Sequence, residues 1–408
     1  MNQKNVNDRK LRILFLAWGY SIHAQRRIGI FASDPQYDVT IVSTYDYQIP
    51  GADTILLSSA KKNRRTFNPN GTTTGKILSP LIVIFKFFRE LAELGRDQGI
   101  LKKTITTKKP DIIFLQTLLY PGYLLLFIRN TIPVIITFWN GDVTWWAKWT
   151  GIERLLKKQI VIHGVTRASA ITVNSKIAFD ACLSYGKSAK YIHLIRYPGV
   201  DLSRFRPIEK KDARNYLGIQ SQKIVFWPRG TGGYLNFETL VAASQIALKK
   251  SDDLHFIVLS PNKGDYVSIQ KDLDAKGIGK HYSFLDTIQF EDMPYYYSAA
   301  DTMISISSND SLPNTMLEAM ACGCPVIMGD IPQIREWVTD GKNGYLCPVK
   351  DADMLAECIQ KVLENREHQN ERFARENLEL VAREVDSTKM SARIKKLVRE
   401  VSSQKMEM

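Results

Sequence analysis

The 408-residue sequence lacks the features that mark secreted, zinc-stabilised and membrane-spanning proteins. Its five cysteines are odd in number, and the pair Cys322 and Cys324, separated by one residue, has no second pair or nearby histidine to complete a zinc site. No apolar run reaches the roughly 18 residues that span a bilayer. The first ten residues, MNQKNVNDRK, are polar and contain no signal-peptide core. We therefore expect a cytoplasmic protein with buried thiols and a disordered segment over residues 1–10.

Acidic residues are scarce in the N-terminal half. Residues 1–205 hold 29 Lys and Arg against 13 Asp and Glu, a net charge of +16, whereas the remainder holds 26 against 29. A basic half can favour nucleic acid, an anionic membrane surface or an anionic substrate, and charge alone does not choose among them. Because the basic residues are scattered and form no recognisable reading module, we expect no nucleic-acid partner.

The chain is too long for one hydrophobic core and predicts two domains. In the first half, strands are expected at residues 12–18, 37–43, 110–116, 132–139, 168–175 and 191–198, with a helix near 22–32. The second half repeats the design, with strands at 223–228, 254–260, 281–286, 301–307 and 324–329. Near-continuous apolar strands that alternate with helices indicate α/β domains built on doubly wound parallel sheets.

A turn-rich segment bracketed by prolines, residues 197–207, is suited to a hinge. It divides the chain into an N-terminal domain, residues 11–205, and a C-terminal domain, residues 206–385. The last segment, residues 386–408, contains a charged amphipathic helix with no place in the second core, so we expect it to return to the first domain. Such sheets bind ligands at the carboxyl ends of their strands, which predicts a cleft between the domains.

One polar loop follows a predicted strand of the second half and leads into a helix. In DSLPNTMLEAMACGCPVI, residues 310–327, Asp310 follows the strand and Glu318 lies in the first turns of a helix that begins near Asn314. The free amides of that helix start favour a phosphate, and the two flanking acids suit hydroxyl-rich groups. A nucleotide sugar has this layout of ribose, diphosphate and hexose. The alternative is that Glu318 only complements the helix dipole.

This stretch resembles the signature of retaining glycosyltransferases of family 4, in which an acid, seven residues and Glu precede Ala-Met-Ala-x-Gly-x-Pro-Val. The resemblance extends through GKNGYLCPVKDADMLAECI, residues 341–359, and back through YPGVDLSRFRP to the first strand. It covers nearly the whole chain. It implies the GT-B fold of the glycogen-phosphorylase-like superfamily. The implied reaction transfers a sugar from a nucleotide-diphosphate sugar to a glycan or lipid-linked acceptor with retention of configuration.

The resemblance also implies roles for single residues of this loop. Glu318 would hold the ribose hydroxyls of the donor, and Asp310 would lie beside the transferred sugar, at a position where the family more often has Glu. The sugar and the distal phosphate would be cradled by the backbone of Leu312, Pro313, Asn314 and Thr315.

A glycine-rich turn, RGTGG, follows the first strand of the second half. Arg229 could neutralise the diphosphate and stabilise the leaving nucleotide, with Gly230 and Thr231 as donor-binding neighbours. Family members usually add a Lys shortly afterwards, where this chain has YLN, residues 234–236. Lys263, in the turn SPNKGD, is the candidate substitute.

The first helix of the chain supplies further candidates. Gly19 follows the first strand, where the family's loop approaches the donor phosphates; its alternative role is a tight strand-to-helix turn. The segment SIHAQRR resembles a family variant with His and Arg at this helix start. His23 and Arg27 are therefore candidate residues of the cleft, the alternative being that either is a surface residue.

The segment TFWNGD, residues 137–142, stands where the family often has Thr-x-His-Gly-x-Asp. Trp139 and Asn140 occupy the His and Gly positions, and Asp142 is kept as a candidate catalytic residue. Trp139 excludes a histidine acting there as acid, base or hydrogen-bond donor. The tryptophans that follow, at positions 145, 146 and 149, favour a core cluster or a membrane-contact edge over a sugar-stacking face.

The segment PLIVIFKFFRELAELGR, residues 80–96, predicts an amphipathic helix. Packing on the sheet of its own domain is favoured over docking to a membrane. Because KKNRR, residues 61–65, precedes this helix in the basic half, peripheral binding to anionic lipid remains a hypothesis.

No Asp-x-Asp pair stands at a strand end, so no metal or other cofactor is expected. No carboxylate nucleophile for a covalent intermediate is evident. We therefore expect the mechanism that the resemblance implies, in which the acceptor attacks the anomeric carbon from the same face that the leaving group departs. One rival hypothesis is a catalytically weakened GT-B protein that acts as a binding or scaffold subunit, favoured by the missing Lys, Asp310 and Trp139. Another is a nucleotide-sugar isomerase of the same fold, which would need a different set of acids.

Overall fold

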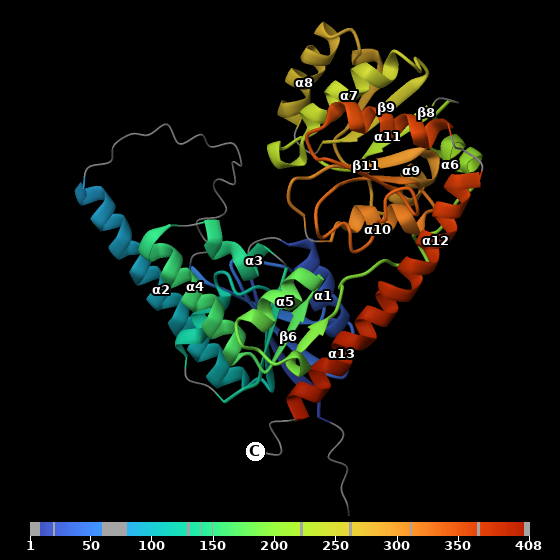
Figure 1. Ribbon diagram of the computed structural model, residues 1–408. Helices are drawn as coiled ribbons and strands as arrows, with labels where there is room; N and C mark the ends of the chain where they lie inside the picture. Colours follow the sequence, from blue (N-terminus) through green and yellow to red (C-terminus); the bar gives the residue numbers. More distant parts are fainter. Residues whose placement is uncertain are drawn as a thin grey trace, which may run out of the picture. The chain divides into compact units, whose positions relative to one another are not determined.

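The computed structural model (Figure 1) divides the chain into two compact units. Unit 1 comprises Met1–Pro198 with Ser391–Met408, and unit 2 comprises Gly199–Met390. The structure describes residues 9–18, 21–58, 80–128, 131–139, 141–148, 150–220, 223–260, 263–310, 312–364 and 368–403. Gly19, Asn140, the basic cluster 61–65 and most of the segment predicted to be disordered lie outside these residues.

Unit 1 contains a seven-stranded parallel sheet in the order β3-β2-β1-β4-β5-β6-β7. The strands are β1 Leu11–Ala17, β2 Tyr37–Ser43, β3 Ala52–Leu56, β4 Ile112–Leu115, β5 Val134–Phe138, β6 Ala170–Val173 and β7 Ile192–Leu194. The α-helices are α1 Ile22–Ala32, α2 Pro80–Lys108, α3 Gly141–Thr144, α4 Gly151–Arg167 and α5 Lys176–Ser184. Short 3-10 helices are η2 Gly122–Phe127, η3 Trp145–Lys148 and η4 Ala189–Tyr191.

Unit 2 contains a six-stranded parallel sheet in the order β10-β9-β8-β11-β12-β13. The strands are β8 Lys223–Trp227, β9 Leu254–Leu259, β10 Tyr282–Leu285, β11 Thr302–Ser305, β12 Val326–Gly329 and β13 Tyr345–Cys347. The α-helices are α6 Lys210–Leu217, α7 Phe237–Leu248, α8 Lys263–Ala275, α9 Met293–Ala299, α10 Asn314–Ala321, α11 Ala352–Glu364 and α12 His368–Glu384. Two 3-10 helices are η5 Gly233–Leu235 and η6 Gly279–His281, and α13, Ser387–Ser403, ends in unit 1.

Both sheets confirm the predicted class of doubly wound α/β domains. Two strands were missed, β3 and β13, which are the edge strands of their sheets. Sequence reasoning did not find them because β3 is only partly buried and β13 has three residues, so neither forms a long apolar run. Among the described helices, none is both long enough and apolar enough to cross a membrane.

The centre of the unit 2 sheet is apolar on both faces. Val225 and Trp227 of β8 pack with α7 and α11 in one cluster, whereas Ile224 and Phe226 pack with α9 and α10 in another. Successive side chains of a strand point to opposite faces, so a strand covered on both sides must be apolar throughout. All five cysteines lie buried in such surroundings, and burial raises the pKa of Cys182 and Cys324 to about 12.

The strand order reverses at one point in each sheet. In unit 1 the reversal lies between β1 and β4, and in unit 2 it lies between β8 and β11. Loops that leave the carboxyl ends of such a strand pair run to opposite sides of the sheet and open a crevice there. The fold thus selects the loops after β1 and β4, and those after β8 and β11, as candidate ligand sites.

The chain passes between the two units at Pro198–Gly199 and at Met390–Ser391. Within unit 2 the two passages are joined, because the Val200 amide donates to the Val385 carbonyl (2.8 Å) and the Ser387 amide donates to the Val200 carbonyl (2.9 Å). Gly199 adopts φ +74°, and a Cβ there would lie 2.3 Å from the Val385 carbonyl oxygen. Only glycine fits this junction without displacing the backbone.

We expect Gly199→Ala to destabilise unit 2 by about 3 kcal/mol, from the left-handed backbone strain and the clash together. Gly218→Ala is the matched control, since Gly218 has φ +67° but no atom within 4 Å of a Cβ. Its cost should be about 1 kcal/mol. Urea unfolding of both variants checks this, and equal losses would contradict the close approach at Gly199.

Candidate active site

The strand reversal of unit 2 brings a cation and a carboxylate together. Arg229 follows β8 and Asp310 follows β11, and Nη2 of Arg229 lies 2.8 Å from Oδ2 of Asp310. Both side chains are about one-sixth exposed. A guanidinium has five donors, so Arg229 can hold Asp310 and still present N–H groups to an anion. These two sequence-predicted residues form one ion pair at the carboxyl edge of the sheet.

Asn236 fixes the loops on both sides of this edge. Its Nδ2 donates to the Ile306 carbonyl oxygen (2.7 Å) and lies 2.8 Å from Oγ of Ser308. The Ser308 amide donates in turn to the Tyr234 carbonyl oxygen (2.8 Å). The loop after β8 and the loop after β11 are therefore tied to each other. Asn236 is buried and left-handed at φ +58°, a conformation that asparagine tolerates better than most residues.

Helix α10 begins at Asn314, as predicted, and its N-cap residue is Pro313, whose side chain makes no capping hydrogen bond. Three buried hydroxyl oxygens of this part of unit 2 have no hydrogen-bond partner among the described residues: those of Ser305 at the end of β11, Ser307 after it and Thr315 in α10. Unpartnered buried polar groups cost about 1–3 kcal/mol each. The free backbone amides of a helix start can bind a phosphate, whereas these three hydroxyl oxygens are enclosed by the fold.

Glu318 lies in the second turn of α10 and is buried, with an exposed fraction of 7%. The phenol of Tyr297, from α9, donates to Oε2 of Glu318 at 3.1 Å. Burial, and then the nearby Glu318, raise the pKa of Tyr297 well above its usual value, so the phenol keeps its proton and remains a donor. Tyr297 thus fixes the orientation of the Glu318 carboxylate. An acid that only complemented the helix dipole could lie on the surface and would need no such buried partner.

In unit 1 the loop after β5 is held by a buried carboxylate. Oδ1 of Asp142 accepts a hydrogen bond from the Trp139 amide (2.7 Å), and Oδ2 accepts one from the Thr117 hydroxyl (3.0 Å). The indole Nε1 of Trp139 donates to the Gln116 carbonyl oxygen at 2.6 Å. Both anchors, Gln116 and Thr117, lie in the loop after β4. Burial raises the pKa of Asp142 from about 3.8 to about 6.

Arg27 is not a surface residue: it lies beneath Trp139 with an exposed fraction of 1%. Its Nη1 donates to Thr137 Oγ1 (2.6 Å) and Gln116 Oε1 (3.1 Å). Its guanidinium also faces the rings of Trp139 and Tyr197, each with its centroid at 4.8 Å. Burial lowers the pKa of Arg27 to about 10, so the group stays charged at neutral pH. Because all of these partners are uncharged and one of them is the Trp139 ring, Arg27 supports the Trp139 loop from below.

The structure gives fewer contacts for the other predicted residues. His23 is half-buried, and its ring centroid lies 5.4 Å from that of Trp139. Lys263 begins α8 instead of lying in a turn, and its side chain falls outside the described positions. Sequence reasoning missed Tyr297, Gln116 and the role of Asn236. Their only signal in the sequence is a polar group next to an apolar strand or helix, which is too common to single them out.

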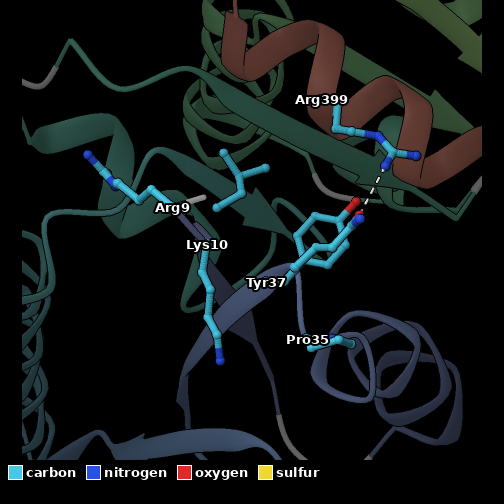
Figure 2. Close-up of a pocket in the computed structure, with 7 residues that line it drawn as sticks. Arg9, Lys10, Pro35, Tyr37 and Arg399 are labelled. Carbon is cyan, nitrogen blue, oxygen red and sulfur yellow. Dashed lines mark hydrogen bonds between the residues drawn. The ribbon is translucent and has the colours of Figure 1, made fainter. Parts of the chain in front are cut away.

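A cavity of about 600 Å³ in unit 1 is lined by none of these residues (Figure 2). It is lined by Arg9, Lys10, Leu11, Pro35, Gln36, Tyr37 and Arg399. Since Leu11 and Tyr37 begin β1 and β2, the cavity lies at the amino ends of these strands. The predicted site residues of unit 1 instead follow the carboxyl ends, so this cavity is not their site.

Comparison with known proteins identifies a family match within the second unit and several curated relatives. Residues 212–378 match the family "Glycosyl transferases group 1". D-inositol 3-phosphate glycosyltransferase from Geodermatophilus obscurus is 32% identical over 183 residues, which are 43% of this chain and 41% of that protein. The enzyme of the same name from Saccharomonospora viridis is 26% identical over 207 residues, 48% of each chain. The chain therefore matches less than half of the length of these curated relatives.

Solved structures confirm the fold over almost the whole chain. HepE of Anabaena, in complex with UDP-glucose, superposes with a TM-score of 0.72 at 17% identity over 96% of this chain and all of that one. Sucrose-phosphate synthase from Thermosynechococcus elongatus gives a TM-score of 0.73 at 18% identity over 97% and 100%. Identities this low support the fold alone. The fold is the GT-B type, with two Rossmann-like units.

Replacing Asn236 with glycine should separate the two strand-end loops of unit 2. Glycine accepts the left-handed backbone, so the change removes the amide and leaves the Ile306 carbonyl oxygen buried without its partner, at a cost of about 2 kcal/mol. Thermal unfolding measures the loss. Lys109→Gly is the control, because Lys109 is exposed and left-handed at φ +45°. A similar loss in both variants would show that Asn236 does not join the loops.

The raised pKa of Asp142 predicts a pH effect on stability. The folded state binds the proton more tightly than the unfolded chain, so the stabilisation is complete below about pH 4 and is lost as pH rises to about 6. Relative to Asp142→Asn, the wild type should lose about 3 kcal/mol between pH 4 and pH 7. Melting temperatures across this range check the difference. The exposed Asp38→Asn serves as control, and a pH-independent difference for Asp142→Asn would refute the assignment.

Proposed function

We propose that the protein is a retaining glycosyltransferase. It would transfer a sugar from a nucleotide-diphosphate sugar to a glycan or lipid-linked acceptor. The single observation that carries the proposal is the gathering of Arg229, Asp310, Glu318 and the start of α10 at the strand reversal of unit 2. A diphosphate, a ribose and a hexose each find a partner of suitable chemistry there.

The donor occupies unit 2 in this proposal. Glu318, oriented by Tyr297, accepts hydrogen bonds from two ribose hydroxyls. The backbone amides of Leu312, Asn314 and Thr315 and the guanidinium of Arg229 hold the diphosphate. Arg229 stabilises the charge that develops when the bond from the anomeric carbon to the phosphate oxygen breaks. Asp310 lies beside the sugar and fixes Arg229.

The acceptor occupies unit 1, which contains most of the basic N-terminal half of the chain. Its hydroxyl attacks the anomeric carbon from the face that the diphosphate leaves, and the hydroxyl proton passes to the leaving phosphate oxygen. Asp142 is the candidate catalytic group of this unit and holds the Trp139 loop through the Trp139 amide. No metal enters the proposed reaction. We place the protein in the cytoplasm, with peripheral contact to anionic lipid.

The comparisons support this proposal and suggest which donor to test first. The name of the Geodermatophilus relative describes glycosyl transfer to an inositol phosphate. HepE, which shares the fold, was crystallised with UDP-glucose and with UDP. UDP-sugars therefore come first as donors. A weakened enzyme that binds a partner is the rival, and the replacement of the family's Lys by the loop that contains Asn236 is the observation in its favour.

The test is thermal stabilisation by UDP, GDP, ADP and CMP and by their common sugars. A ligand at 100 times its dissociation constant raises the free energy of unfolding by about 2.7 kcal/mol, which shifts the melting temperature by several degrees. Glu318→Gln keeps the shape of the side chain but removes its charge and one acceptor. It should weaken the preferred nucleotide by about 10- to 100-fold.

Glu371→Gln is the matched control, because Glu371 is exposed on α12. It should leave the nucleotide affinity unchanged. The absence of a shift with any nucleotide at millimolar concentration would favour the weakened-enzyme rival. A turnover assay with NMR detection of the product's anomeric configuration tests retention separately, since an inverted product would overturn that part alone.

A further inference from the structure

The cavity at the amino ends of β1 and β2 is lined by cations from two remote parts of the chain (Figure 2). Arg9 and Lys10 precede β1, and Arg399 lies on α13. None of the seven residues that line the cavity is acidic. Its volume of about 600 Å³ falls in the range of small-molecule sites. Charge and size together suit an anionic small molecule.

The walls of the cavity are well packed. The Leu11 amide donates to the Gln36 carbonyl oxygen (2.9 Å), which joins the start of β1 to the turn before β2. Tyr37 is 5% exposed, and its ring meets the Phe31 ring edge-on with the centroids 5.0 Å apart. On α13, Val398 is fully buried. Because backbone pairing and buried side chains hold its walls, the cavity is formed before any ligand binds.

Two acids beside the cavity already have cations as partners. Oδ2 of Asp34 accepts a hydrogen bond from Nζ of Lys395 (2.7 Å). That bond, and more weakly the charge of Arg399, lower the pKa of Asp34, so its carboxyl group is ionised at neutral pH. Oδ1 of Asp111 lies 2.6 Å from Nη2 of Arg9. The negative charge near the cavity is therefore matched by Lys395 and Arg9.

Lys10 and Arg399 carry the surplus positive charge. Both are exposed, and neither forms an ion pair with any residue that the structure describes. Nη1 of Arg399 donates to Oε1 of Gln36 (3.3 Å), so most of the five N–H donors of this guanidinium can serve a ligand. The acid next to it, Glu400, lines a different cavity with His193. An anion in the cavity would thus gain donors from the start of β1 and from α13.

The positions of the cations indicate which anions fit. Figure 2 shows Arg9, Lys10 and Arg399 projecting from separate walls, and their charged ends do not meet. One phosphate group must lie about 3 Å from each of its donors, so it would engage one wall alone. A molecule with two or more phosphate groups can engage Lys10 and Arg399 together. A concave site of this size also favours a small ligand over a bilayer surface.

We propose that this cavity binds a small molecule that carries two or more phosphate groups, with Lys10 and Arg399 as its main donors. The candidate donor and acceptor loops follow the carboxyl ends of strands, whereas this cavity lies at the amino ends of β1 and β2. The chain enters unit 1 within α13, at Ser391. A ligand that holds Lys10 and Arg399 would tie this connecting helix to the sheet of unit 1. The role of the site is therefore regulatory and not catalytic.

The test is calorimetric titration of the full chain with tripolyphosphate and with inorganic phosphate. Wild type should bind tripolyphosphate at least about tenfold more tightly than phosphate, because only the longer anion reaches both walls. Lys10→Gln/Arg399→Gln should weaken the binding of tripolyphosphate about tenfold. Both positions are exposed, so circular dichroism should show an unchanged fold.

Lys102→Gln/Lys103→Gln is the matched control, because it removes the same charge from exposed positions of α2 in unit 1. It should bind tripolyphosphate like the wild type. Arg229→Gln, which removes the cation of the candidate donor site, should retain the binding that Lys10→Gln/Arg399→Gln weakens. Equal weakening by the two double variants would indicate unspecific attraction to a basic protein and overturn the proposal. So would loss of binding in Arg229→Gln, or no binding by the wild type.

Hydrogen exchange locates the bound anion. Tripolyphosphate should slow the exchange of backbone amides in residues 391–403 of α13, and Lys10→Gln/Arg399→Gln should abolish this effect. Unchanged exchange in α13 despite tight binding would overturn the tie between α13 and the sheet. Displacement of tripolyphosphate by vesicles that contain phosphatidylglycerol, but not by vesicles of pure phosphatidylcholine, would show that the cavity takes lipid head groups. That result would overturn the small-molecule proposal.

Discussion

The neighbouring position of β8 and β11 is the constraint on which the candidate donor site depends. These strands lie side by side where the strand order reverses, so the segments that follow them open from one edge of the sheet. Asn236 adds a direct link, because its side-chain amide in the loop after β8 donates a hydrogen bond to the Ile306 carbonyl oxygen in the loop after β11. Arg229 and Asp310 are 81 residues apart in the chain, and they meet because their strands do. Loss of that pairing would remove the ion pair, the anchored loops and the site together.

Loops that follow two neighbouring strands are also joined in unit 1, where the strands are β4 and β5 and the chemistry differs. The loop after β4 supplies the Thr117 hydroxyl and the Gln116 carbonyl oxygen, and both hold the Trp139 loop after β5. Asp142 completes the loop by accepting the Trp139 amide. The candidate site of unit 2 contains the ion pair of Arg229 and Asp310, whose guanidinium can also bind an anion. In unit 1 the buried carboxylate of Asp142 and the buried guanidinium of Arg27 support the Trp139 loop separately, with no contact between them among those described. A cation surrounded by neutral groups and ring faces keeps its charge, and therefore contributes positive potential beneath Trp139.

The sequence predicted the parallel sheets, the start of α10, and the positions of Arg229 and Asp310 after strands and of Glu318 in the helix, because each depends on local pattern. Apolar runs predict buried strands, and a polar loop before an apolar-periodic helix predicts a strand-end site. It did not reach Tyr297, which lies 21 residues before Glu318 and contacts it only through packing of α9 against α10. It read Arg27 as a cleft or surface residue, since an arginine at a helix start is usually solvated. Its burial follows from the aromatic rings of Trp139 and Tyr197, which are remote in the chain.

The unpartnered hydroxyls near α10 bear on whether unit 2 binds a ligand or is a relic. Ser305, Ser307 and Thr315 bury oxygen atoms that find no hydrogen bond within the residues described. Alanine at the serines or valine at Thr315 would remove that cost of about 1–3 kcal/mol for each group. Their oxygens are enclosed, however, so a ligand at the strand ends would not reach them without movement of the neighbouring side chains. A site for a phosphate or a sugar at this edge would therefore depend on accessible groups, which are the partly exposed guanidinium of Arg229 and the amides at the start of α10.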